Sequence, residues 1–180
     1  MISNLKKNLT IIVPIYNEED NIERLCKELD DFLKNSIVDT QILFINDGSN
    51  DNSEKLIKEQ CKSNKKFKLL NFCKNYGLSA AIKAGFDNTT TSLVGYIDAD
   101  LQTNPEDFNL LLNKIDEFDL VTGVRVNRKD YINKNITSFI ANSIRKIFTK
   151  DKMDDTGCPL KIIKTRYAKN IPMFRGIHRF

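Results

Sequence analysis

Leu93–Gln102, with the sequence LVGYIDADLQ, joins a short apolar run to two carboxylates that stand two residues apart. An apolar run of this length is typical of a strand buried on both faces, as in a parallel sheet. In open parallel sheets the ligand site lies outside the carboxyl ends of the strands. We therefore expect Asp98 and Asp100 at a functional rim of such a sheet.

Similar apolar runs recur on both sides of this segment, and stretches with helical spacing separate them. The predicted strands are Leu9–Ile15, Gln41–Asn46, Phe67–Phe72, Leu93–Asp98 and Leu120–Val124, and the predicted helices are Glu18–Lys34, Asp51–Ser63, Ser79–Asp87 and Glu106–Phe118. This alternation predicts an α/β fold: a mainly parallel, twisted sheet with helices on both faces. No linker or repeat interrupts it, so residues 1–180 are expected to form a single domain.

Composition excludes several classes of protein. With 180 residues, 41% hydrophobic and 29% charged, the chain is typical of a globular domain. No stretch approaches the roughly 18–20 apolar residues of a membrane span, and the N-terminus lacks the pattern of a signal peptide. The 4 cysteines are scattered and there is 1 histidine, which argues against a disulfide framework or a zinc site and favours a cytoplasmic protein.

Charge is unevenly distributed along the chain. Residues 1–120 carry 14 Lys and Arg against 20 Asp and Glu, whereas residues 121–180 carry 14 against 4, a net charge of +10. This asymmetry favours an anionic partner, such as phosphate groups or a membrane surface, over a mere compositional drift. Residues 131–150 combine apolar spacing with basic residues, as in a helix that lies on an anionic membrane or one that packs on the sheet. Nucleic acid is not expected, because no recognition motif accompanies the charge.

The two carboxylates are suited to a metal site. Asp98 and Asp100 can share Mg²⁺ or Mn²⁺, and Gln102 adds a neutral oxygen within one turn. The same residues also match the polar start of a helix, since Asn104, Pro105 and Glu106 follow. The 7 glycines form neither G-x-G-x-x-G nor a P-loop, which argues against dinucleotide oxidoreductases and P-loop NTPases.

Other predicted strand ends also carry polar residues. Asp47 is suited to accept hydrogen bonds from a base or ribose, and Lys74 to present a cation to a diphosphate. Each also fits an ordinary turn. Glu18 and Glu19 fit either a ligand-binding loop or the acidic first turn of a helix.

Several motifs follow one another in a recognisable order. They are VPIYNEE at 13–19, NDGSND at 46–51, NYG at 75–77 with Ala80, Ala81 and Gly85, DADLQ at 98–102 with Pro105 and Glu106, and, further on, GVR at 123–125, DTGC at 155–158 and HRF at 178–180. Together they resemble the family 2 glycosyltransferases with the GT-A fold. The similarity is greatest to bacterial members of the dolichol-phosphate-mannose-synthase-like branch.

This resemblance implies a metal-dependent, inverting enzyme of hexosyltransferase type. The donor would be a nucleotide-diphosphate sugar, and the acceptor a polyprenyl phosphate at the cytosolic membrane face, in cell-envelope glycan biosynthesis. By similarity, a first group of residues would hold the nucleoside, Asp98 would lie near the ribose and diphosphate, and Asp100 and Gln102 would hold Mg²⁺ or Mn²⁺. That first group is Pro14, Tyr16, Glu18 and Asp47.

Basic residues are expected around the reacting phosphates. Arg125 and Arg128 are candidates to stabilise the leaving diphosphate, and His178 and Arg179 are placed there by the resemblance alone. A phosphate acceptor needs little help from a general base, whereas a glycan hydroxyl would need one. Asp155 is the nearest candidate base, and it also fits a turn.

Two other functions fit parts of the pattern. A haloacid-dehalogenase-like phosphatase would use Asp98 as nucleophile and Asp100 as acid, but that signature wants Thr or Val where Leu101 stands. A non-catalytic nucleotide-sugar-binding module is the second alternative. Family members usually continue past Phe180, so the catalytic domain is expected to be truncated at its C-terminal end.

Overall fold

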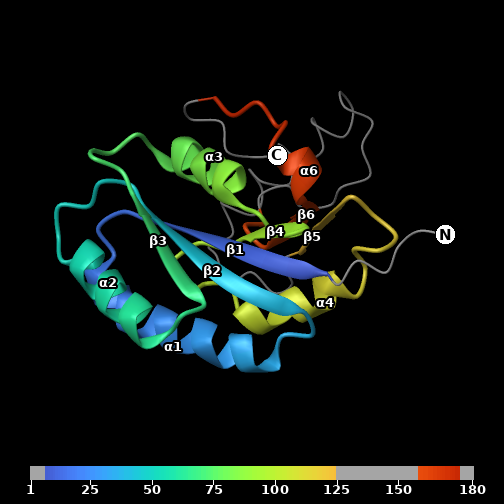
Figure 1. Ribbon diagram of the computed structural model, residues 1–180, viewed down its shortest axis with the longest axis horizontal. Coiled ribbons are helices and arrows are strands. Elements are labelled where there is room, and N and C mark those ends of the chain that lie inside the picture. The colour runs from blue at the N-terminus through green and yellow to red at the C-terminus, as the bar shows by residue number, and fades with distance from the viewer. Residues whose placement is uncertain (1–6, 125–157, 175–180) are drawn as a thin grey trace, which may run out of the picture.

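One six-stranded sheet organises the part of the chain that the computed structural model describes, residues 7–124 and 158–174. The strand order is β3-β2-β1-β4-β6-β5 (Figure 1). The strands are β1 (Asn8–Ile15), β2 (Asp39–Asn46), β3 (Phe67–Asn71), β4 (Leu93–Tyr96), β5 (Leu120–Thr122) and β6 (Lys161–Lys164).

The sheet is parallel over its first four strands, as the sequence predicts. β1 pairs in parallel with β2 and β4, and β2 pairs in parallel with β3. β6 runs antiparallel to both β4 and β5, so β5 points in the same direction as β4. The carboxyl ends of all five predicted strands therefore lie at one edge of the sheet.

Helices cover both faces of this sheet, as expected for the predicted α/β fold (Figure 1). One face is covered by α1, α2 and α4, and the other by α3 and α6. The helical bounds are α1 (Glu19–Asn35), α2 (Ser53–Ser63), α3 (Leu78–Asn88), the 3₁₀ turn η1 (Pro105–Asp107), α4 (Phe108–Leu112) and α6 (Thr165–Ala168). Each longer helix follows a strand through a short loop, which brings its N-terminus to the same edge.

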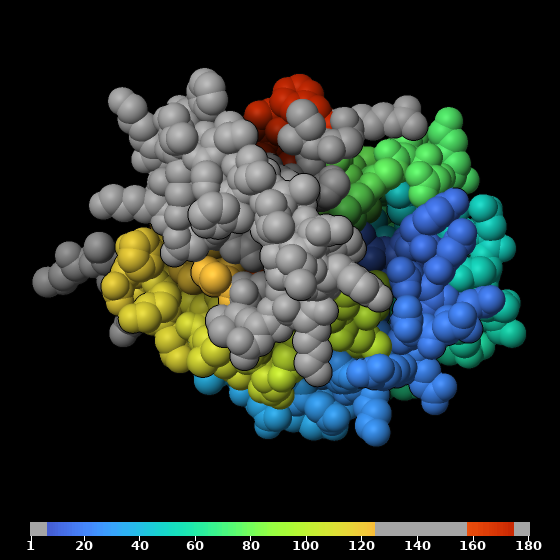
Figure 2. Space-filling model, turned by 180° about the vertical axis from the view of Figure 1, so that it is seen from behind, coloured from blue at the N-terminus to red at the C-terminus, as the bar shows by residue number. Residues whose placement is uncertain are grey.

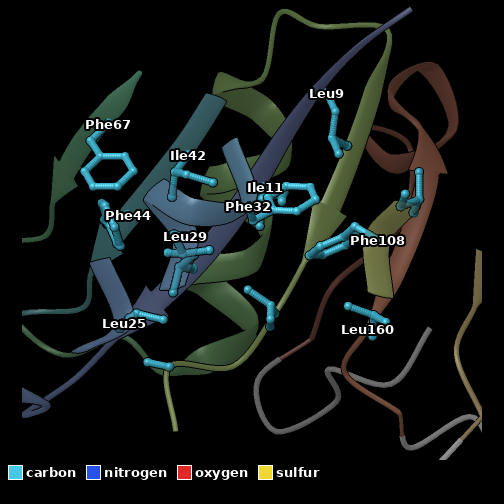
Figure 3. Close-up of a cluster of buried hydrophobic side chains, with 14 of the residues drawn as sticks. Leu9, Ile11, Leu25, Leu29, Phe32, Ile42, Phe44, Phe67, Phe108 and Leu160 are labelled. Carbon is cyan, nitrogen blue, oxygen red and sulfur yellow. The ribbon is translucent and has the colours of Figure 1, made fainter. Parts of the chain in front are cut away.

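The larger core lies between the sheet and the α1, α2 and α4 layer (Figure 3). Leu25, Leu29 and Phe32 form the buried stripe of α1, at the helical spacing that the sequence shows. The ring of Phe32 packs at 5.9 Å from that of Phe108, at the start of α4. This contact ties the two helices together beneath β1 and β4.

The segment after β4 differs from the prediction of one long helix over residues 106–118. Regular α-helix ends at Leu112, and the following backbone forms i→i+3 hydrogen bonds, such as Lys114 N–H to the Leu111 carbonyl at 3.0 Å. Ile115 nevertheless remains buried. Phe108, Leu111 and Leu112 are buried as well, whereas Phe118 is 54% exposed, so this tighter backbone buries only part of the segment's apolar residues.

The end of α1 fastens this segment to the rest of the domain. Asn35 Nδ2 donates to Glu106 Oε1 at 3.0 Å, and the Ile37 N–H donates to Asn109 Oδ1 at 3.2 Å. Figure 2 shows the two segments, blue and yellow, lying next to each other at the lower edge of the molecule. The loop that leaves Asp98 is therefore anchored at its far end.

Candidate functional site

A cavity of about 320 Å³ opens at the carboxyl ends of β1, β2 and β4. Six residues predicted as site residues line it together: Pro14, Tyr16, Glu18, Asp47, Asp98 and Asp100. Asn75 and Gly77, from the loop before α3, complete one side of the cavity. The carboxyl ends of the parallel strands therefore bring together residues that lie more than 80 positions apart in the sequence, such as Tyr16 and Asp98.

Asp47 is buried at the end of β2, with 3% of its surface exposed. Its Oδ1 accepts the Tyr76 N–H at 2.7 Å and its Oδ2 accepts the Gly77 N–H at 2.8 Å. The carboxylate thus holds the loop that carries Asn75 and Gly77 against the cavity. Its predicted contact with a base or ribose stays a prediction.

Gly48 lets the same two loops approach each other. Its φ of +66° suits glycine, and a Cβ at this position would lie 2.3 Å from the carbonyl carbon of Lys74. The loop after β2 and the loop after β3 are therefore in direct backbone contact, next to Asp47.

Glu19, in the acidic motif after β1, connects the N-terminus of α1 to the N-terminus of α2 through hydrogen bonds. Glu19 N–H donates to Asp51 Oδ2 at 3.0 Å, and Asn52 N–H donates to Glu19 Oε2 at 2.9 Å. Burial alone would raise the pKa of Asp51, but hydrogen bonds from Ser53 and Glu19 hold that pKa below its usual value. This exchange fixes the N-termini of α1 and α2 beside the cavity.

Asp98 is held by the side chain of Tyr96, whose hydroxyl donates to Asp98 Oδ1. Burial, followed by the nearby charges of Asp98 and Asp100, raises the pKa of Tyr96 well above its usual range. The hydroxyl therefore stays protonated and acts as the donor in this pair.

Asp100 is exposed and lies on a turn two residues after Asp98. Its Oδ1 accepts the Gln102 N–H at 3.1 Å, and Leu101 between them has a left-handed φ of +59°. Such a backbone is uncommon for a bulky residue, and strain of this kind gathers at functional sites. The turn directs both aspartates to the cavity lining, whereas Gln102 is exposed and does not line the cavity.

Lys74 is also exposed and outside the cavity lining. Its Nζ lies 5.3 Å from the centre of the Tyr76 ring, which is a cation–π contact at the edge of the site. Its predicted contact with a diphosphate stays a prediction.

Two residues near the site were not predicted from the sequence. The sequence places Tyr96 only within a strand, and it predicts neither a strand over residues 161–164 nor a role for Lys161. Lys161 is buried, with 4% of its surface exposed, and lies directly opposite Tyr96 in the β4–β6 register. A buried lysine in an apolar strand is the one signal that could have pointed to this position.

Several predicted residues lie outside the described residues: Arg125, Arg128, Asp155, His178, Arg179 and the stretch 131–150. Within residues 7–124 and 158–174, no helix has the length and apolar character needed to cross a membrane.

Comparison with known proteins identifies the family. The sequence model of glycosyl transferase family 2 matches residues 10–171. An undecaprenyl-phosphate 4-deoxy-4-formamido-L-arabinose transferase of Klebsiella pneumoniae (strain 342) is 36% identical over 159 residues, which is 86% of this chain and 48% of that protein. A transferase of the same name from Salmonella choleraesuis is 34% identical over 157 residues, with the same coverage. The chain thus spans about half the length of the curated relatives it matches.

Solved structures share the fold at low sequence identity. A mannosyltransferase of Pyrobaculum calidifontis, in complex with GDP-Man and Mn²⁺, matches 95% of this chain and 48% of its own, with a TM-score of 0.67 and 17% identity. Glucosyl-3-phosphoglycerate synthase of Mycobacterium tuberculosis, in complex with Mn²⁺ and UDP-glucose, matches 93% of this chain and 59% of its own, with a TM-score of 0.72 and 16% identity.

Proposed function

Because the chain belongs to glycosyl transferase family 2, we propose that it transfers a sugar from a nucleotide-diphosphate sugar to a polyprenyl phosphate. The cavity at the strand ends carries this proposal, since it brings Asp98 and Asp100 together with Tyr16 and Asp47. The nucleoside would lie against Tyr16 and Asp47, and the diphosphate would reach Asp98 and Asp100. The similarity to undecaprenyl-phosphate transferases supports the class of acceptor.

A divalent cation fits the two aspartates. Among residues 7–124 and 158–174, no group of three His, Cys, Asp or Glu side chains could hold a metal alone. Asp98 and Asp100 supply hard carboxylate oxygens to one cavity. Mg²⁺ is commonly held by one or two carboxylates, with substrate phosphates and water as the remaining ligands. We therefore propose Asp98 and Asp100 as the protein ligands, while the predicted contribution of Gln102, which lies outside the cavity lining, stays a prediction.

The reaction calls for stabilisation of the leaving group more than for a base. A phosphate acceptor is already anionic at neutral pH, whereas the departing nucleoside diphosphate gains negative charge in the transition state. A bound Mg²⁺ or Mn²⁺ would neutralise part of that charge. The residues of the chain would bind and orient the donor, with Asp47 holding the loop of Asn75 and Gly77 in place. Arg125 and Arg128 are proposed to meet the remaining charge, and Asp155 to act as base only for a glycan acceptor.

A membrane-bound acceptor suggests where the protein works. We propose that the basic residues within 121–180, with a net charge of +10, hold it at the anionic cytosolic face of the membrane.

Nucleotide binding tests the donor site. Calorimetric titration with UDP, GDP and CDP, in Mn²⁺ or in EDTA, should identify one nucleotide whose affinity rises at least about tenfold with Mn²⁺. Asp100→Ala should remove that gain. Asp116→Ala, which removes an exposed carboxylate outside the cavity lining, is the matched control and should keep the gain.

Turnover tests the transfer itself. The nucleotide sugar carrying the identified base should release nucleoside diphosphate only when a polyprenyl phosphate is added. Equal nucleotide affinity in Mn²⁺ and EDTA would contradict the metal assignment. Tight donor binding with no release would instead favour a nucleotide-sugar-binding module.

A further inference from the structure

Tyr96 is the last residue of β4 and stands two positions before Asp98. The Ile97 N–H still pairs with the Ile12 carbonyl at 3.2 Å, so the backbone remains extended beyond Tyr96. In an extended chain, side chains two residues apart point to the same face. The Tyr96 hydroxyl therefore reaches the Asp98 carboxylate along one face of the sheet and donates a hydrogen bond to Oδ1.

The ring of Tyr96 is held by packing. Its side chain is 5% exposed and belongs to the apolar cluster between the sheet and α3, with Ile12, Ala81 and Ile82. Ala81 also lines the cavity, so the ring lies close behind the cavity wall. A buried ring has few alternative rotamers, and its hydroxyl is consequently a fixed donor.

We propose that Tyr96 is a positioning residue that fixes the Asp98 carboxylate toward the donor diphosphate and its metal. This inference rests on the proposed function. The torsion that turns a carboxylate about its Cβ–Cγ bond is broad, so an unrestrained Asp98 would sample many orientations. A charge-assisted hydrogen bond from a packed phenol restricts that torsion before the ligand arrives, and such supporting contacts preorganise a site.

The sequence alone does not indicate that Tyr96 positions Asp98. Strand interiors commonly hold tyrosine for its apolar ring. The role becomes visible only in the structure, where β4 ends at Tyr96 and the Asp98 carboxylate lies within hydrogen-bond reach of the phenol.

The test compares Tyr96→Phe with Tyr167→Phe. The first removes only the hydroxyl that contacts Asp98, while the second removes a hydroxyl that contacts Asp119, a carboxylate outside the cavity lining. Calorimetry with the nucleoside diphosphate identified above should give an affinity in Mn²⁺ about tenfold lower for Tyr96→Phe. Its affinity in EDTA should change less than about twofold, and Tyr167→Phe should match the wild type in both buffers. A purely structural role for Tyr96 would lower the melting temperature without this selective loss.

A double-mutant cycle asks whether Tyr96 acts through Asp98. In the Asp98→Ala background, Tyr96→Phe should cause no further loss of affinity in Mn²⁺, because the hydroxyl no longer has this acceptor. Additive losses would overturn the positioning role. Tyr96→Met, which fills the site without a hydroxyl, provides the same cycle should the phenylalanine variant fail to fold.

The outcomes separate this inference from the proposed function. A wild-type chain that binds no nucleotide in either buffer overturns the proposed function and the inference together. A wild-type chain with Mn²⁺-dependent binding that Tyr96→Phe leaves intact overturns the positioning role alone.

Discussion

Asp47 uses both oxygens of its carboxylate for backbone N–H groups of the loop after β3. In Asp47→Asn, one of these oxygens becomes an NH₂ group that faces an N–H. We expect the free energy of unfolding to fall by about 1.5–3 kcal/mol, the usual value of hydrogen bonds to a charged group. Affinity for the nucleoside diphosphate should fall as well, with or without Mn²⁺, as urea denaturation and calorimetry would show.

Asp87→Asn provides the control for this substitution. Asp87 forms an exposed i,i+4 pair with Lys83, at 2.5 Å, so its loss should change the free energy of unfolding by less than about 1 kcal/mol. A destabilised Asp47→Asn with unchanged nucleotide affinity would show that Asp47 serves the loop alone.

Asp51 couples the contact between two helix starts to pH. Its pKa is lowered in the folded protein, because the hydrogen bonds from Ser53 and Glu19 outweigh the effect of burial. Its contribution to stability is therefore complete above the unfolded pKa of about 3.9 and is lost as the pH falls through the lower folded value. Between pH 6 and pH 3 the wild type should lose more unfolding free energy than Asp51→Asn, as measured with urea.

Glu23→Gln removes an exposed carboxylate of α1 and serves as the comparison. It should lose as much stability on acidification as the wild type. An Asp51→Asn variant that also follows the wild-type pH curve would contradict the role of this carboxylate.

At the scale of elements, the loops after β2 and β3 approach so closely that Gly48 leaves no room for a side chain. Gly48→Ala and Gly77→Ala both place alanine at a positive φ, but only Gly48 has neighbouring backbone in the way, since nothing lies within 4 Å of a Cβ at Gly77. We expect Gly48→Ala to cost about 1–3 kcal/mol more in unfolding free energy than Gly77→Ala. Urea denaturation of both variants measures this difference, and equal costs would show that the loops separate easily.

The sequence predicts β1 to β5 because buried strands of a parallel sheet are near-continuous apolar runs. It did not predict β6, whose two isoleucines between lysines are too short a run to separate from a loop. Because ligand sites lie outside the carboxyl ends of parallel strands, the sequence also indicates that Tyr16, Asp47 and Asp98 lie close together, and all three line one cavity. The Asp98 partner Tyr96 and the loop-holding role of Asp47 could not be predicted, because both depend on side-chain contacts that strand order alone does not specify.

The first 120 residues of the protein have a negative net charge, and the last 60 have a positive one. Residues 121–180 carry a net charge of +10, so the protein should bind vesicles with anionic lipids more strongly than neutral ones. Co-sedimentation should weaken between about 0.05 and 0.5 M salt, because screening shortens the reach of surface charge. Vesicles of neutral lipid alone are the control, and sedimentation indifferent to lipid charge and salt would contradict a membrane-facing role.

The late position of β6 in the sequence leaves a sheet edge unpaired in the nascent chain. In the described sheet, β3, β2, β1 and β4 are adjacent in that order, whereas β5 pairs only with β6, which leaves the ribosome about 40 residues later. Until Lys161–Lys164 has been synthesised, β5 has no place in the sheet and β4 keeps one edge open. Open strand edges invite pairing with other chains. The side of the sheet that carries Asp98 is therefore closed last, and a nascent chain halted before residue 161 would present its unfinished edge to its neighbours.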